Sequence, residues 1–416
     1  MLLTIGRGLS PRTKTISSSA AVDLSTKTVA LIGDSITGQN ISANGREHLS
    51  QGYMTMLNAI TGQRYVSSPS YNLGVSGYSL SQIEAGVTDL AALSPTPDLV
   101  IVLGGSNDTV AATTESAMIT SLGNIYSYIT GTLGAKVIAL TIPPRTQHPG
   151  GEALTTDMQT KIDNVNAWIL SQSGDVTPID IYQGLVLSGT DTPDPAYFDK
   201  EGTSNTSYVH PNPQGALKIA QTIQSALAPI YGTYDIPDMS QDNLLANDTL
   251  AGAGGTNNSN LTGDVANNNT FYAYSSASGS LSKPTATSQR IDISYTDFTS
   301  YDTVQFYEGD ITSGYSASDT VYAEAEIEIL NGEGLEGLWI EVSDKGSSTL
   351  TYKCMTKFDV AEFPTDNRTY HIKTPIFQPQ AGNTALAVKI RGELDSSGGQ
   401  TASIDFIIQQ IRCAIA

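Results

Sequence analysis

The chain has 416 residues, of which 41 are acidic and 21 basic, so its formal net charge at pH 7 is −20. Hydrophobic residues make up 39% and charged residues 15%, which is enough for packed cores and excludes a highly charged disordered polymer. The negative charge argues against nucleic-acid binding, because phosphate neutralisation needs a surface rich in lysine and arginine. The length predicts two or three domains.

The sequence shows no clear signal for membrane insertion, secretion or metal binding. No apolar run reaches the roughly 18 residues that a membrane span needs, so we expect no membrane insertion. Residues 1–25 are basic without the apolar stretch of about 7–15 residues that marks a secretory signal, and we expect them to form an N-terminal arm. Cys354 and Cys413 form either one bridge or two buried free thiols. No cysteine or histidine cluster indicates a metal, and we expect no cofactor.

Short apolar strands alternate with amphipathic helices between residues 26 and 232. Such strands are buried on both faces, so the alternation predicts a three-layer α/β domain with a parallel sheet. The expected strands cover residues 29–32, 99–103, 136–142 and 176–181, and the expected helices cover residues 46–60, 117–129, 157–170 and 215–227.

The apolar period changes to two after a short linker at residues 233–241. Between Val321 and Ile329, apolar residues alternate with a tyrosine and three glutamates, and residues 338–342, 386–391 and 404–408 continue the pattern. One buried face and one polar face per strand predict an all-β antiparallel sandwich over residues 242–416.

Some side chains on the polar faces of these strands carry a second interpretation. Tyr322 and Trp339 are aromatic residues that could stack on a sugar, although cross-strand packing or an oligomer contact is the more common role. The acidic row of Glu324, Glu326 and Glu328 is typical of a solvated strand face, with calcium binding as the alternative.

Four polar segments follow strands or precede helices in the first domain. Gly33-Asp34-Ser35 and Gly104–Asp108 each follow an apolar strand, Asn72–Gly77 forms a glycine-rich loop, and His210-Pro211-Asn212 precedes a helix. Ligands of parallel sheets bind at such strand ends, and a helix start there directs N–H groups at developing negative charge. Each segment alone is more typical of a turn or a helix cap.

The chain has four histidines, and His210 is the best candidate for a general base because it lies on a loop before a helix. His48, placed in an expected helix, and His371, placed in the β-rich half, are expected to be structural or surface residues. His148 lies in a polar loop and could line a cleft, although an exposed loop histidine is the more common case.

The order GDS, NxGxSG, GxND and HPN resembles the SGNH hydrolase family, the GDSL-type esterases and acylhydrolases, over about residues 28–230. The resemblance implies that Ser35 is the nucleophile and that His210 is its general base. It also implies an oxyanion hole made by the Gly74 backbone N–H and the Asn107 side-chain amide, with the Ser35 N–H as a third donor.

One position departs from the family pattern. Ser207 stands three residues before the histidine, where the family usually carries the aspartate of the triad. An acid from the preceding loop fills the role, or a backbone carbonyl orients the imidazole ring, or the site is degenerate and inactive. The acids of that loop are Asp191, Asp194, Asp199 and Glu201, and Asp199 is favoured by its proximity.

The β-rich half resembles the jelly-roll sandwiches that accompany glycan-active enzymes and phage tail proteins, as a carbohydrate-binding or oligomerisation domain. Together with the family resemblance it implies a serine esterase that removes acetyl or other short acyl groups from a polysaccharide. An extracellular or virion-associated site fits this function, as does a homo-oligomer, which would be a trimer in a phage tail.

The alternative is a non-catalytic, glycan-binding adhesin on a degenerate hydrolase fold. A lipase for long acyl chains is less favoured, because no apolar lid segment is visible. The net charge of −20 favours a neutral or weakly charged acylated glycan as the partner, since an acidic surface repels polyanions at low salt.

Overall fold

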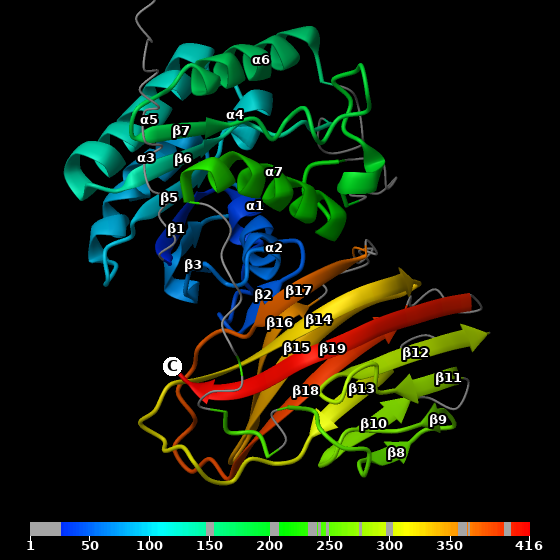
Figure 1. Cartoon of the computed structure of the whole chain (residues 1–416). Helices are drawn as coiled ribbons and strands as arrows, with labels where there is room; N and C mark the ends of the chain where they lie inside the picture. The colour runs from blue at the N-terminus through cyan, green and yellow to red at the C-terminus, as the bar shows by residue number, and fades with distance from the viewer. Residues whose placement is uncertain are drawn as a thin grey trace, which may run out of the picture.

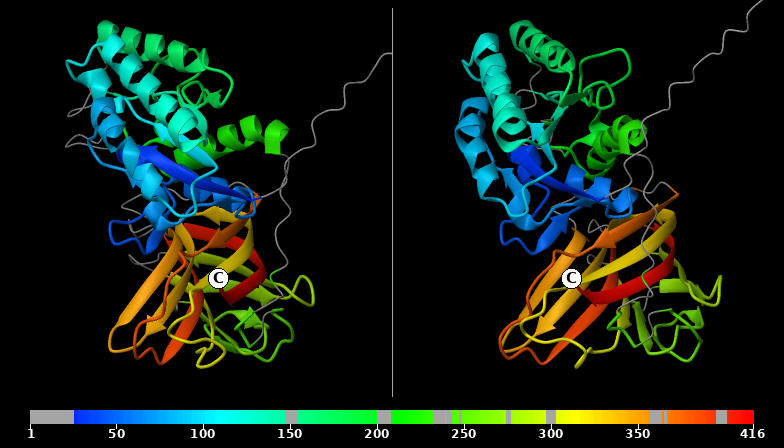
Figure 2. Two further views of the ribbon diagram at one scale, coloured as in Figure 1. Left: turned by 90° about the vertical axis from the view of Figure 1, so that its left-hand side faces the viewer. Right: turned by 60° about the vertical axis from the view of Figure 1, so that its left-hand side comes forward.

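The computed structural model consists of an α/β part and a β part (Figure 1). The expected N-terminal arm lies outside the described residues, and of the expected linker only Met239 is described. Figure 2 shows from two further sides that the α/β part sits on one end of the β part. The structure describes residues 26–146, 154–199, 208–231, 239, 243–246, 249–273, 277–296, 303–356, 364, 367–394 and 401–416.

The α/β part is built on one parallel sheet with the strand order β3-β1-β5-β6-β7, and β4 pairs with the end of β1. Every pairing in this sheet is parallel, because each strand is followed by a segment that crosses back over the sheet. The strands are β1 (Lys27–Gly33), β3 (Tyr65–Val66), β4 (Asn72–Gly74), β5 (Leu99–Leu103), β6 (Lys136–Leu140) and β7 (Val176–Ile179).

Helices cover both faces of the sheet, as the sequence predicts. Alternate residues of β1 enter different cores: Val29 and Leu31 pack with α2 and α7, whereas Ala30 and Ile32 pack with α3, α5 and α6. The helices are α1 (Ser35–Gly38), α2 (Tyr53–Ile60), α3 (Leu80–Gly86), α4 (Ser106–Val110), α5 (Glu115–Ser127), α6 (Thr156–Leu170) and α7 (Pro213–Tyr231).

The β part is an antiparallel sandwich with a jelly-roll topology. Its last eight strands pair first with last, in the order β12 with β19, β13 with β18, β14 with β17, and β15 with β16. This nesting folds one long hairpin over itself into two sheets, which is the jelly-roll arrangement. The eight strands are β12 (Gln289–Thr296), β13 (Thr303–Glu308), β14 (Val321–Glu333), β15 (Leu335–Lys345), β16 (Thr349–Thr356), β17 (Arg368–Lys373), β18 (Ala385–Leu394) and β19 (Thr401–Ile415).

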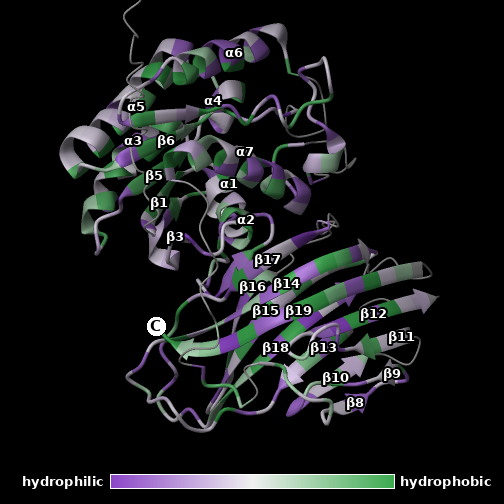
Figure 3. Ribbon diagram, in the orientation of Figure 1, coloured by the Kyte–Doolittle hydropathy of each residue, from purple (hydrophilic) through white to green (hydrophobic). Residues whose placement is uncertain are grey.

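Four shorter strands extend the two sheets at the far side from the α/β part (Figure 1). Two of the added pairings, β8 with β10 and β9 with β11, are parallel, whereas the eight long strands pair with one another in antiparallel fashion. Bands of apolar and polar residues alternate along the long strands (Figure 3), which matches the period of two in the sequence. The added strands are β8 (Thr256–Asn258), β9 (Thr262–Gly263), β10 (Asn269–Ala273) and β11 (Ala277–Ser282).

A strand of the α/β part joins the jelly roll. The prediction of a helix over residues 46–60 is wrong in its first half, where β2 (Glu47–Leu49) pairs in parallel with the edge strand β16. The Lys353 N–H also donates to the Arg46 carbonyl at 2.9 Å. The side-chain amide of Gln63 donates to the His371 carbonyl of β17 at 2.6 Å, and α2 packs beside β17. The two parts therefore share a sheet and one apolar core.

The two aromatic side chains proposed for sugar stacking are not available for it. Trp339 is only 5% exposed, its indole N–H donates to Glu341, and the Arg391 guanidinium lies 5.4 Å from its ring centre. The Lys373 ammonium lies 3.5 Å from the ring centre of Tyr322, which is also buried. Cations on neighbouring strands cover these rings, so the stacking hypothesis is wrong for both.

The acidic row is engaged by partners within the sandwich. Glu324 is buried and accepts hydrogen bonds from His371 and Arg412, whereas Glu326 and Glu328 accept from glutamine side chains of β19. Among the described residues no group of three potential metal ligands gathers, so the calcium alternative finds no support there.

Two further observations concern the cysteines and the helices in the described part of the chain. Cys354 and Cys413 are both buried free thiols, which decides between the two alternatives for this pair. Burial raises the pKa of each thiol to about 12. No helix among the described residues is long and apolar enough to cross a membrane.

Candidate active site

The proposed nucleophile lies where the first strand turns into a helix. Strand β1 ends at Gly33, and Ser35 opens α1. Asp34 caps this helix, since its carboxylate accepts a hydrogen bond from the Ile36 N–H at 3.1 Å. A Cβ atom on Gly33 would lie 2.1 Å from the Leu103 carbonyl oxygen, so only glycine lets β1 approach β5 this closely. The turn leaves Ser35 partly exposed.

The proposed general base contacts this serine. His210 Nε2 lies 2.7 Å from Ser35 Oγ, although 175 positions separate the two residues in the chain. The side chain of Asn212 holds the start of α7, because its oxygen accepts from the Gly215 N–H at 2.9 Å. The distance between Ser35 and His210 is that of a hydrogen bond through which a proton moves from a hydroxyl to an imidazole.

Asp199 supports the histidine loop through the main chain. Its N–H donates to the His210 carbonyl at 2.9 Å, and its carboxylate accepts from the Gln51 side chain at 2.7 Å. Asp194 caps a short 3₁₀ turn, and Asp191 accepts from the Tyr182 hydroxyl. Three other residues that the sequence singles out, Ser207, Glu201 and His148, lie outside the described residues.

The two expected oxyanion donors differ in what they contact. The Gly74 N–H donates to the Asn72 side-chain oxygen at 3.0 Å, so this donor is engaged within its own loop. Asn107, the second residue of α4, donates one N–H of its amide to the Tyr78 carbonyl at 2.9 Å. A side-chain amide carries two N–H groups, so Asn107 keeps a second donor while the first anchors the loop that contains Tyr78.

The same loop holds a donor that the sequence analysis missed. Gly77 has a φ of +80°, is exposed, and its N–H has no hydrogen-bond partner within the described part of the chain. The Ser35 N–H at the start of α1 likewise has no partner among the residues described. The second glycine of the segment Asn72–Gly77 was a signal for this position, because a positive φ there favours glycine.

Two buried charged groups stand behind these residues. Asp34 is fully buried, and burial raises the pKa of its carboxyl to about 6, against the lowering effects of the Ile36 hydrogen bond and of His210 and Arg145. Arg145 is 4% exposed and donates to the carbonyl and the hydroxyl of Ser106. The Asp34 carboxylate therefore lies within electrostatic reach of both the imidazole and the guanidinium.

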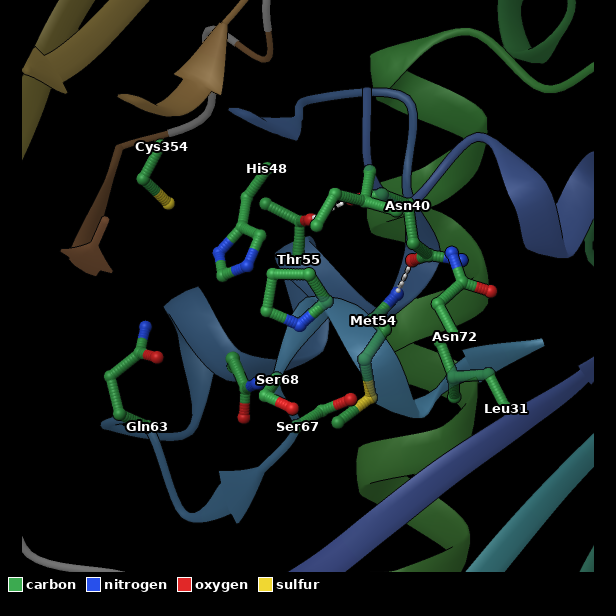
Figure 4. Close-up of a pocket in the computed structure, with 13 residues that line it drawn as sticks. Leu31, Asn40, His48, Met54, Thr55, Gln63, Ser67, Ser68, Asn72 and Cys354 are labelled. Carbon is green, nitrogen blue, oxygen red and sulfur yellow. Dashed lines mark hydrogen bonds between the residues drawn. The ribbon is translucent and has the colours of Figure 1, made fainter. Parts of the chain in front are cut away.

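A small cavity lies away from the nucleophile, between the two parts of the molecule (Figure 4). His48 of β2 and Cys354 of β16 face each other across its rim, and Gln63 lies beside them. The volume is about 30 Å³, enough for roughly two water molecules and too small for an acyl chain or a sugar. We therefore assign it to the packing of the two parts.

The other described histidines have structural roles, as expected. His48 lies in β2 instead of a helix, and burial lowers its pKa to about 4. His371 is buried in β17, and its Nε2 lies 2.9 Å from a Glu324 carboxylate oxygen. Both lie where the two parts of the molecule meet, since His48 is hydrogen-bonded to the Lys373 backbone of β17.

Residues 31–217 match the model of the GDSL-like lipase/acylhydrolase family. The α/β part is a GDSL-like acylhydrolase domain. All four motif segments, including Ser35, Asn107 and His210, lie inside the matched range. The match to this family indicates ester hydrolysis as the chemistry of the domain.

Two solved structures are similar to about half of this chain. One is a GDSL-like lipase from Bacteroides thetaiotaomicron, with 19% identity over 48% of this chain and 87% of that chain, and a TM-score of 0.36. Another is a lipase/acylhydrolase from Enterococcus faecalis, with 18% identity over 49% and 95%, and a TM-score of 0.35. Among curated protein sequences no match reaches significance.

Proposed function

We propose that the acylhydrolase domain is a serine esterase that removes acetyl or other short acyl groups from a polysaccharide. The observation that carries this proposal is the 2.7 Å contact between Ser35 Oγ and His210 Nε2 at the carboxyl end of the parallel sheet. A serine hydroxyl is a weak nucleophile at neutral pH, and a base of pKa near 7 within hydrogen-bond distance activates it.

In the proposed reaction, Ser35 Oγ attacks the acyl carbonyl carbon while its proton moves to His210 Nε2. The tetrahedral intermediate collapses when the bond to the sugar oxygen breaks, and the imidazolium returns the proton to that oxygen. A water molecule then attacks the acyl-serine with His210 again as the base. The products are the free sugar hydroxyl, the carboxylic acid and the original serine.

The oxyanion of this intermediate needs donors that are already oriented. We assign this role to the second N–H of the Asn107 amide, the Ser35 N–H and the Gly77 N–H. Gly77 replaces Gly74 in this assignment because the Gly74 N–H donates to Asn72. Loss of one such donor costs about 100- to 1000-fold in rate.

The jelly roll and the net charge support an acylated glycan as substrate. Jelly-roll domains recur in lectins and other glycan-binding proteins, and this one is joined to the esterase by a shared sheet. Ser35 is partly exposed, which suits an acyl group carried on a large polymer. The charge of −20 favours a neutral or weakly charged glycan, outside the cell or on a virion, as the partner.

The experiment is hydrolysis of p-nitrophenyl esters from acetate to decanoate, followed by release of acetate from acetylated polysaccharides. We expect the highest kcat/KM on acetate and complete loss of turnover in Ser35→Ala and His210→Ala. Ser225→Ala, an exposed serine on α7, is the matched control and keeps full activity. Full activity in Ser35→Ala contradicts the proposal, and a preference for decanoate indicates a lipase instead.

The serine at position 207 favours a second candidate, a non-catalytic glycan adhesin, because it replaces the usual triad acid. This candidate predicts glycan binding without turnover of any ester. Asp199→Asn tests the acid of the first candidate: a loss of kcat of about 100-fold or more supports Asp199, since the charge of a triad acid contributes several orders of magnitude. A backbone carbonyl as the partner of the imidazole predicts a much smaller loss.

A further inference from the structure

A dipeptide on the loop after β6 contacts both the helix that carries Asn107 and the loop that carries His210. Arg145 and Thr146 follow β6 after two prolines, and both are buried, with Arg145 4% exposed. The two residues lie on a loop that carries none of the sequence motifs. We call them the Arg145–Thr146 clamp.

On one side the clamp holds the helix that carries the oxyanion amide. One terminal nitrogen of the Arg145 guanidinium donates to the Ser106 carbonyl at 2.8 Å and lies 3.1 Å from the Ser106 hydroxyl. Ser106 is the first residue of α4 and the chain neighbour of Asn107. Hydrogen bonds from a charged donor are stronger than neutral ones, so they fix the start of this short helix.

On the other side the clamp holds the loop of the general base. The Thr146 N–H donates to the Tyr208 carbonyl at 2.9 Å, and the Tyr208 N–H donates to the Thr146 hydroxyl at 2.8 Å. Tyr208 lies two residues before His210. This reciprocal pair joins the histidine loop to the same segment that holds α4.

Burial of the guanidinium is costly unless its charge and its donors are used. Arg145 also donates from Nε to the Thr146 carbonyl at 3.2 Å, which ties the two halves of the clamp together. Its positive charge lies within electrostatic range of the buried Asp34 carboxylate beside the nucleophile. The charge is therefore placed among the groups of the site and not on the solvent side of the loop.

We infer that Arg145 is a positioning residue that, with Thr146, keeps Asn107 and His210 in register with Ser35. This inference rests on the proposed esterase function. Displacement of a reacting group by about 1 Å costs on the order of 100-fold in rate, so a clamp that fixes both groups has a measurable effect on kcat.

The test is steady-state hydrolysis of p-nitrophenyl acetate by Arg145→Met, which keeps the apolar stem and removes the guanidinium. We expect kcat to fall about 10- to 100-fold, with KM changed less than about threefold, because the clamp acts on the transition state and not on substrate binding. Arg145→Lys keeps the positive charge but not the several N–H donors of the guanidinium. Its kcat is expected to fall less than that of Arg145→Met. Unchanged kcat in both variants overturns the inference.

A double-mutant cycle separates positioning from a general loss of structure. If Arg145 acts through Asn107, then Arg145→Met reduces kcat less than about threefold once Asn107→Ala is present. Losses that multiply in the double variant overturn the inference. Should Arg145→Met fail to fold, Thr146→Val carries the test, because it removes only the hydroxyl that accepts from Tyr208.

A matched control is a lysine of α6 that contacts the other end of α4. Lys161 donates to carbonyls at the far end of α4, those of Asp108, Thr109 and Ala111. Lys161→Met therefore removes a cation from α4 without touching its start, and we expect kcat within about twofold of the parent. A drop in Lys161→Met equal to that in Arg145→Met overturns the inference, whereas full activity in Ser35→Ala overturns the proposed function itself.

Discussion

The histidine between the two parts of the molecule gives the chain a defined sensitivity to acid. His48 lies in β2 opposite Cys354 of the jelly roll, and burial lowers its pKa to about 4 from a usual 6.5. A hydrogen bond to the Lys373 backbone acts to raise this pKa, and the Lys373 charge acts to lower it further. The folded state therefore holds this imidazole neutral while the unfolded chain protonates it below pH 6.5.

The sign and size of the effect follow from this difference. Stability from a neutral His48 is fully present above pH 6.5 and is lost as the pH falls toward 4, because the unfolded state binds the proton first. At pH 4.5 the loss amounts to about 2.5 kcal/mol, from 1.36 kcal/mol per unit of pKa difference. That is a large fraction of the stability of an ordinary domain.

The perturbation is His48→Gln, which keeps a donor group and cannot titrate in this range. The free energy of unfolding is measured in urea at several pH values from 7.5 to 4.5 for the parent and the variant. We expect the free energy of unfolding of the variant, relative to that of the parent, to be about 2.5 kcal/mol higher at pH 4.5 than at pH 7.5. The opposite slope from Asp34, whose pKa is raised to about 6, is common to both proteins and cancels.

The control is Gln63→Leu, which removes a hydrogen bond to His371 at the same interface without changing a titrating group. The difference in free energy of unfolding between Gln63→Leu and the parent is expected to be independent of pH. A His48→Gln difference that stays constant within about 0.5 kcal/mol over this pH range refutes the reasoning.

Three further predictions concern the fold. Gly33→Ala brings a Cβ within 2.1 Å of a backbone oxygen and is expected to cost about 1–3 kcal/mol and most of the esterase activity, whereas Gly86→Ala, with open space around it, changes little in thermal denaturation. The only two tryptophans lie in different parts, so variants that retain Trp168 or Trp339 alone are expected to unfold at the same urea concentration; separate midpoints contradict a shared core. Burial acts to raise the pKa of Glu324, but its partners lower it, so Glu324→Gln is expected to destabilise most at neutral pH and progressively less below pH 4.5, measured by urea unfolding.

Continuous apolar runs made most of the α/β fold predictable. Leu99–Leu103 is a strand with the expected bounds, and the change of apolar period matches the change from a parallel to an antiparallel sheet architecture. The helix expected over residues 46–60 shows a case in which an apolar pattern predicts the wrong element. Leu49 fits the helical spacing, but its segment is drawn into a sheet by β16, about 300 residues away, and that pairing leaves no local signal.

The candidate site was predicted from polar residues beside strand ends and helix starts. Ser35 and Asn107 follow strand ends and His210 precedes a helix, and the structure brings Ser35 and His210 into contact. Gly74 and Gly77 both lie in the glycine-rich loop, so the sequence does not tell which one offers its N–H to the oxyanion. Only the hydrogen bond from the Gly74 N–H to the Asn72 side chain distinguishes them. Arg145 carried no signal, because an arginine after two prolines reads as an exposed loop residue until its burial is known.

The pairing of β2 with β16 constrains how such a protein is recombined. A boundary drawn in the linker after α7 separates the two parts in sequence. It also removes β2 from the seven-stranded sheet and leaves β16 as an open sheet edge. A chimera that exchanges the jelly roll therefore has to exchange residues 46–50 with it, although these residues lie only eleven positions after Ser35. The part exchanged in such a chimera is therefore discontinuous in sequence and includes residues close to the nucleophile turn.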